Sequence, residues 1–229
     1  MKTALLCLLL LLPGERPDKV YLRDNSDWWS RLSALADATP QSIETPATMF
    51  QILGVSLDEQ GFSGIPAKFG STVAVGRGDA SEGRQQLCFA STDKRVHLVF
   101  EQGEVHYAYY IFYGGADWNG SQYCRKSTLV VDDSGNAAGI HLGMSPAEVR
   151  AILGKPTASH QGISNQSGMR YARLTRTKLD AEEKARIRER SPQVSEAELN
   201  AEYEVSVEIE TRFTGSRLTY LAVVRSETN

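Results

Sequence analysis

The strongest structural signal in this sequence is a strict alternation of side chains over residues 203–213, YEVSVEIETRF. Successive side chains of an extended strand point to opposite sides, whereas a helix would spread this pattern around its axis. One side carries Val205, Val207, Ile209, Thr211 and Phe213, and the other carries Ser206, Glu208, Glu210 and Arg212. The segment therefore predicts an antiparallel sheet with one buried face and one solvated face.

Other segments have the same character. Residues 71–78, 84–91 and 95–113 give four strand candidates in the first half, with a hairpin turn at Gln102-Gly103. Residues 170–179 and 217–226 flank the alternating segment in the second half. A turn at 214–216 leads into the last of these strands.

A short helix with clear boundaries precedes the second group of strands, in GIHLGMSPAEVRAILGKPT, residues 139–157. Ser145 and Glu148 have capping-box spacing, and Pro146 suits the first helical position. Gly154 is placed to end the helix. The apolar residues of the segment predict a staple and one core-facing side; they are Met144, Val149, Ile152 and Leu153.

Residues 52–70 repeat this plan ahead of the first group of strands. Ser56 and Glu59 have the same capping-box spacing, and Gly70 stands where Gly154 stands in the second copy. We therefore predict an α+β fold of two tandem repeats, each a helix followed by an antiparallel sheet. The repeats are expected at 51–128 and 129–229.

The second repeat carries a charged insertion at about 179–203. Ala, Glu, Arg and Lys dominate it, which favours helix, and Pro192 is expected to divide it into two helical pieces. A solvated helical hairpin and an arm that docks a partner are both compatible with this composition.

The N-terminal residues have the character of an export signal. Lys2 precedes an unbroken apolar run over 4–12, which is too short to span a bilayer but suits a secretory signal. We predict a signal peptide at 1–18 and an N-terminal helix and linker at 19–50, with the helix at 27–37. No other apolar run is long enough for a transmembrane span, so the expected location is periplasmic or secreted.

Two cysteines remain once Cys7 is removed with the signal. In an oxidising compartment an even pair favours a disulfide, here between Cys88 and Cys124. Two buried free thiols are the alternative. Without a CxxC motif or clustered histidines, the pair makes a poor zinc site.

Composition and motifs give little sign of catalysis. The formal net charge of −3 and the absence of basic runs argue against nucleic acid as a partner. No nucleotide, metal or nucleophile motif is present, so we expect no cofactor and no enzymatic activity. An unfamiliar enzyme would have to use His97 or His106, predicted as cross-strand neighbours, or Asp132-Asp133, which a turn explains more simply.

An aromatic segment, VHYAYYIFYGGADWNGSQY, is the best candidate for a binding surface. Tyr and Trp dominate binding hot spots because they bury a large area at a small entropy cost. Tyr107, Tyr109 and Tyr113 fall on one side of a strand, and Trp118 and Tyr123 follow in a loop. These five residues are the predicted partner-binding site, and burial of one aromatic side in the core is the competing interpretation.

The segment GMSPAEVRAILGKPT resembles the signature of the SmpA/OmlA (BamE-like) family, GMS-x-x-x-V-x-x-x-[LI]-G-x-P-T. The tandem layout is also similar to that of the β-lactamase inhibitory protein. These resemblances imply an exported bacterial module whose sheet face binds a protein, in the manner of an inhibitor. A structural or assembly role in the cell envelope is the alternative.

Overall fold

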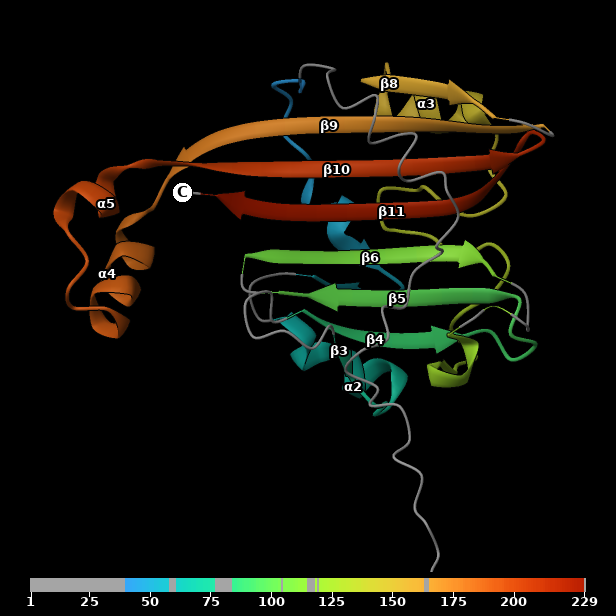
Figure 1. The fold of residues 1–229 in the computed structure, drawn as a ribbon, viewed down its shortest axis with the longest axis horizontal. Coiled ribbons are helices and arrows are strands. Elements are labelled where there is room, and N and C mark those ends of the chain that lie inside the picture. Colours follow the sequence, from blue (N-terminus) through green and yellow to red (C-terminus); the bar gives the residue numbers. More distant parts are fainter. Residues whose placement is uncertain are drawn as a thin grey trace, which may run out of the picture.

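The computed structural model describes residues 40–57, 61–76, 84–103, 105–114, 118, 120–162 and 165–228. One nine-stranded sheet dominates this part of the chain, in the order β3-β4-β5-β6-β11-β10-β9-β8, with β7 pairing in parallel with β4 (Figure 1). Its strands are β3 (Val75–Gly76), β4 (Gln85–Ala90), β5 (Val96–Gln102), β6 (His106–Tyr113), β7 (Arg125–Lys126), β8 (Ala158–Gln161), β9 (Gln166–Lys178), β10 (Glu202–Thr214) and β11 (Arg217–Thr228).

The predicted α+β fold of two helix-plus-sheet repeats is wrong, because both halves contribute to this single sheet. Strands β6 and β11 join them, pairing antiparallel from Tyr220 opposite Phe112 to Ser226 opposite His106. If each half formed its own sheet, each sheet would have two unpaired edge strands. The pairing of β6 with β11 removes one of these edges from each half. The protein is therefore mainly antiparallel β, with only short helices among the described residues.

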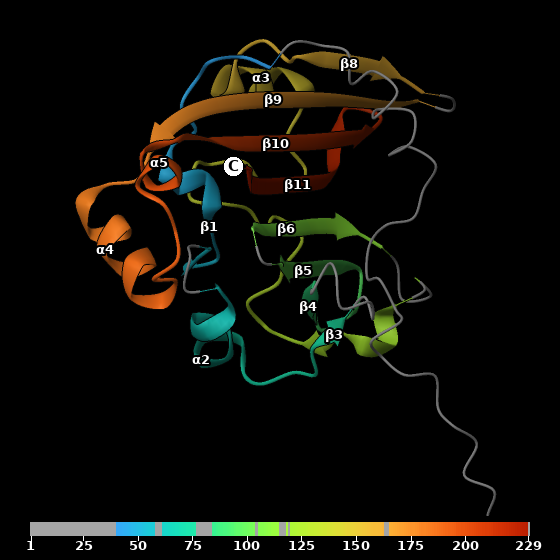
Figure 2. The ribbon, with the colours of Figure 1, turned by 60° about the vertical axis from the view of Figure 1, so that its left-hand side comes forward.

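One face of the sheet, which we call the core face, holds the main hydrophobic core. Leu98, Phe100, Tyr109 and Ile111 from the first half pack there with Ile209 from the second. The short elements that cover it are η2 (Ala47–Phe50), the hairpin of β1 (Gln51–Ile52) and β2 (Val55–Ser56), α2 (Ile65–Phe69) and α3 (Pro146–Leu153). They lie on one side of the sheet in Figures 1 and 2.

The predicted alternation of β10 is confirmed on the core face, where Val205, Val207, Ile209, Thr211 and Phe213 are all buried. The opposite face is less solvated than predicted, since Glu210 and Arg212 are only 2% and 5% exposed. The Arg212 guanidinium donates to Glu210 at 2.6 Å and lies 4.0 Å from the centre of the Tyr220 ring. Mutual neutralisation and stacking allow both charged groups to be buried.

Helix α3 begins and ends where its sequence predicts. Ser145 and Glu148 form a complete capping box, and Gly154 follows the last helical residue with a φ of 80°, which favours glycine. Val149 and Leu153 are buried as expected. Ile152 is 40% exposed instead. Val149 and Leu153, four residues apart, define the buried side of the helix, and Ile152 lies beside that side.

The first copy of this helix plan differs from the second. Ser56 is part of strand β2, so it does not cap a helix, and Glu59 lies outside the described residues. A 3₁₀ turn, η3 (Gly61–Gly64), precedes α2, and Ile65 and Phe69 bury the inner side of that helix. The five-residue α2 is shorter than α3 and has no side-chain cap.

Two helices lie within the charged insertion: α4 (Ala181–Arg190) and α5 (Glu196–Asn200), with Pro192 in the turn between them. They project beyond the ends of β9 and β10 (Figure 1). Asp180 caps α4 and Ser195 caps α5, each through a capping box. Leu199 of α5 is buried, whereas α4 has no buried residue.

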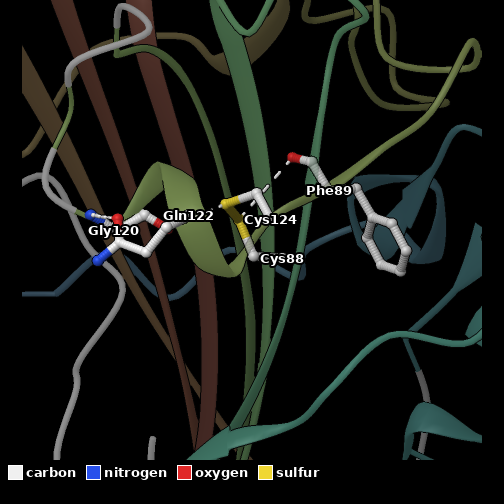
Figure 3. Close-up of a disulfide and its surroundings, with 5 residues drawn as sticks. All are labelled: Cys88, Phe89, Gly120, Gln122 and Cys124. Atoms are coloured by element: carbon white, nitrogen blue, oxygen red, sulfur yellow. Dashed lines mark hydrogen bonds between the residues drawn. A yellow bond between two sulfur atoms is a disulfide. The ribbon is translucent and has the colours of Figure 1, made fainter. Parts of the chain in front are cut away.

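The predicted disulfide between Cys88 and Cys124 is confirmed, with the two Cα atoms 4.4 Å apart. It attaches the end of η4 (Ser121–Tyr123) to strand β4 on the face opposite the core (Figure 3). Gly120 before this turn donates its N–H to the Gln122 side chain at 3.1 Å. A disulfide is compatible with an oxidising compartment.

The predicted signal peptide at 1–18 and the predicted helix at 27–37 lie outside the described residues. Within the described part, no helix is long and apolar enough to cross a membrane.

Candidate functional site

The five predicted aromatic residues do not form one surface. Tyr107, Tyr109 and Tyr113 do share a side of β6, and that side is the core face. Tyr109 is fully buried, donates its hydroxyl to the Met49 carbonyl at 2.9 Å and accepts from the Asn136 amide at 2.8 Å. Burial raises the pKa of Tyr109, so its hydroxyl stays neutral. Its side chain is not available to a partner in this structure.

Tyr107 is half-buried near the start of β6, at the opposite end of the strand from Tyr113. The Phe50 ring meets it edge-on with the ring centres 5.9 Å apart. Arg225 of β11 donates to its hydroxyl at 2.7 Å. These contacts hold Tyr107 between the core and the charged end of β11.

Trp118 and Tyr123 belong to a second, smaller hydrophobic cluster on the face opposite the core. The Trp118 ring packs against His97 and Phe112, with ring centres 4.8 Å and 5.0 Å away. Both predicted residues are half-buried there beside the disulfide.

Tyr113 alone among the five is exposed, at 40%. Its hydroxyl donates to the Asp132 carbonyl at 2.6 Å, and Arg95 donates to the Asp132 carboxylate at 2.9 Å. Arg95 also pairs with Asp93, which accepts a hydrogen bond from Ser91 at 2.6 Å. These contacts join the start of β5, the end of β6 and the loop before α3.

Two exposed apolar side chains precede Asp132 in the same loop. Leu129 and Val131 are 37% and 45% exposed, although both are large hydrophobic residues. The Ser134 hydroxyl accepts from the Val131 N–H at 2.8 Å, and the Ser134 N–H donates to the Val131 carbonyl at 3.1 Å. Asp132-Asp133 thus occupy a turn, as expected. We call Asp93, Arg95, Tyr113, Leu129, Val131 and Asp132 the Tyr113 surface.

Hydrogen bonds and burial shift the pKa values of two groups on the Tyr113 surface. The Ser91 and Arg95 hydrogen bonds lower the pKa of Asp93 well below its usual range. Partial burial, together with the nearby Asp132 charge, raises the pKa of Tyr113. The surface therefore presents a neutral phenol beside the ion pair of Arg95 and Asp93.

The two strand histidines are not neighbours, contrary to the prediction. His97 pairs with Phe112 near the open end of the β5–β6 hairpin, whereas His106 lies beside the turn. The register of the hairpin causes the separation, because its turn follows Gln102 immediately. His97 is fully buried, and this burial lowers its pKa to about 4. It is a neutral packing residue between Phe112 and Trp118.

A buried polar row around His106 is the feature that sequence analysis missed. His106 donates from Nε2 to the Glu101 carboxylate at 2.7 Å, and its Nδ1 lies 3.1 Å from the Ser226 hydroxyl. Glu101 is fully buried and also accepts from Gln86 at 2.6 Å. The available signal was a carboxylate in an otherwise apolar strand, VHLVFEQ.

This acid–imidazole–hydroxyl row has the composition of a nucleophilic triad, so the partners of the neighbouring backbone N–H groups matter. Hydrolases stabilise the tetrahedral oxyanion with backbone N–H groups, commonly that of the residue after the nucleophile. Here the Glu227 N–H already donates to the Val105 carbonyl at 2.9 Å. The hydrogen bonds of the row link β4, β5, β6 and β11.

Among the described residues, no three His, Cys, Asp or Glu side chains lie together in a way that could hold a metal ion.

No protein-family model, curated protein sequence or solved structure matches the chain.

Proposed function

We propose that this chain is an exported, non-enzymatic protein-binding module that contacts its partner through the Tyr113 surface. The observation that carries the proposal is the exposure of Leu129 and Val131 beside a tyrosine and an arginine that are already immobilised by hydrogen bonds. Tyr and Arg are enriched among hot-spot residues, and groups ordered before binding lose less entropy on association.

The disulfide and the predicted signal support export. The resemblance of residues 139–157 to the SmpA/OmlA (BamE-like) family also favours an exported module. An inhibitor-like role suits this surface, because a rigid loop with apolar side chains flanked by charges of both signs can complement the rim of an enzyme cleft.

The test is site-specific photo-crosslinking in a cell-envelope extract. Benzoyl-phenylalanine replaces Val131 in one protein and Val73, which is 66% exposed outside the surface, in the other. We expect one protein adduct from position 131 and none from position 73. Adducts of the same mass and yield from both positions would contradict the proposal.

Two further variants examine the chemistry of the contact. Tyr113→Ala removes the ring and should reduce the adduct at position 131 by about tenfold or more, the range for loss of a hot-spot residue. Tyr113→Phe keeps the ring and loses only the hydrogen bond to Asp132, so it should retain most of the adduct. Equal yields from the two variants would show that the ring is not a contact.

The second candidate is a structural or assembly role in the envelope, which the family resemblance favours. In that case the adduct should fractionate with membranes and contain an integral membrane protein. An inhibitor-like module should give an adduct with an enzyme recovered outside the membrane fraction.

A further inference from the structure

A cavity of about 190 Å³ lies between helix α4 and the ends of β10 and β11. In Figures 1 and 2, α4 lies close to these strand ends, at the side of the sheet where the C-terminus is marked. Four charged and three apolar or aromatic residues line the cavity; they are Glu183, Arg186, Arg190, Glu227, Leu179, Ile187 and Tyr203.

Helix α4 presents one side to this cavity. Glu183, Ile187 and Arg190 are spaced four and three residues apart, so they share a side of the helix, and they line the cavity together with Arg186. Contacts to α5 hold the helix in this orientation. Arg188, on another side, donates to both oxygens of Glu196 at 2.8 Å and 2.9 Å.

A second contact strengthens the α4–α5 hairpin. Lys184 donates to the Asn200 side chain at 2.8 Å, and the neighbouring Leu199 is buried. Helix α4 is therefore held in place by its contacts with α5, although α4 itself has no buried residue.

Both carboxylates of the cavity interact with other residues, so Arg190 is the cation that remains for a ligand. Glu227 pairs with Arg225, outside the cavity lining. Glu183 accepts the backbone N–H of Asp180 at 2.9 Å as part of the α4 capping box. Arg190 forms no ion pair with any of the described residues. Its guanidinium offers a planar pair of donors that matches a carboxylate.

The remaining lining is apolar. Leu179, Ile187 and Tyr203 provide it, and Tyr203 also packs against the main core. Helices that cover an apolar surface normally pack onto it with few voids. Here Ile187 of α4 and the residues opposite it line a hollow that is partly open to solvent.

We propose that this cavity binds a small organic carboxylate with an apolar or aromatic body, such as an aryl or short acyl carboxylate. The carboxylate lies against Arg190, and the body packs on Tyr203, Leu179 and Ile187. The cavity is smaller than the roughly 300–1,000 Å³ typical of pockets for drug-sized ligands, which restricts the occupant to a small molecule. This site is separate from the Tyr113 surface and does not depend on the proposed partner.

The experiment is a titration of the disulfide-bonded protein with 3-phenylpropionate, followed by ¹H–¹⁵N NMR. We expect saturable shifts of the amides in 179–190 and near 203 and 227, with a Kd of roughly 10 µM to 1 mM for so small a ligand. The neutral amide, 3-phenylpropionamide, should bind at least about tenfold more weakly, because it cannot form the charge-assisted pair. Inorganic phosphate alone should give no saturable shift, because it has no apolar body.

Variants separate charge recognition from simple filling of space. Arg190→Ala should weaken 3-phenylpropionate by about tenfold or more, and Ile187→Trp should abolish binding by occupying the cavity. Arg176→Ala removes a positive charge from an exposed residue of β9 and should leave the Kd unchanged. Since α4 has no buried residue, the arginine variants should melt within about 2 °C of the parent.

The proposal is overturned if acid and amide bind equally, or if no saturable shift occurs up to about 10 mM. Saturable shifts outside the cavity lining, or full binding by a folded Ile187→Trp protein, would also overturn it.

Discussion

Single residues explain why polar groups persist inside this sheet. Glu101 accepts hydrogen bonds from Gln86 and His106 across three strands, and the buried Tyr109 hydroxyl donates to the Met49 carbonyl. His97 is different, because neither of its ring nitrogens has a hydrogen-bond partner among the described residues. Its burial therefore disfavours the protonated form without any compensating contact.

His97 should make stability depend on acid. Its pKa falls from 6.5 to about 4 on folding, so the unfolded chain binds the proton first and stability is lost as pH falls through this window. Between about pH 7 and pH 4.5 the loss from this residue should be about 2 kcal/mol. Urea unfolding of the parent and of His97→Phe measures it. The variant should lose this share of the pH dependence, and an unchanged dependence would show that His97 is protonated in the folded state.

Gly135 should tolerate no side chain. A Cβ atom at this position would lie 2.3 Å from the Ile140 carbonyl oxygen and 2.6 Å from the Cα of His141, both backbone atoms that cannot rotate away. Gly135→Ala should therefore lower the free energy of unfolding by about 2 kcal/mol or more. Chemical denaturation measures the change. Gly139→Ala is a poor control because its φ is 87°, so Gly64→Ala, with open space around it, serves instead.

At the scale of elements, local signals predicted most strands and the second helix correctly. The alternation in β10 and the caps of α3 are properties of adjacent residues, which a sequence displays directly. The joining of β6 to β11 was not predictable in this way, because it depends on residues more than one hundred positions apart. The positions of the five candidate aromatic residues were also not predictable, because their burial depends on residues far away in the sequence. Only the packed structure shows that Tyr109 enters the core while Tyr113, four residues later, remains at the surface.

The α3 cap should be measurable by itself. Ser145→Ala removes the acceptor for the Glu148 N–H and should cost about 1 kcal/mol of stability, the usual value for a capping side chain. Ser145→Asp keeps an acceptor at the cap and should retain most of that stability. Thermal unfolding compares the two variants. Equal losses would show that the hydrogen bond across the cap contributes nothing.

At the scale of the whole molecule, the disulfide closes a loop that contains the central hairpin β5–β6. Cys88 and Cys124 are 36 residues apart, and a loop of this length corresponds to about 4 kcal/mol in the chain-entropy estimate. The Cys88→Ser, Cys124→Ser double variant should lose up to that amount. Denaturant unfolding with and without reductant measures it for the parent. A parent whose stability is unaffected by full reduction would contradict the prediction.

The pairing of β6 with β11 also has a consequence for how the chain reaches its native state. Residues 106–113 complete a meander early in the sequence, yet their partner strand lies in 217–228, so one edge of that meander stays open until the final strand arrives. Contacts across such a separation close slowly, because the loop entropy is lost before the contact is gained. During this interval the exposed edge of β6 can pair with another chain. The folding yield of newly made protein should therefore depend on dilution or a chaperone at this step. Pairing of β11 with β6 then covers the exposed edge.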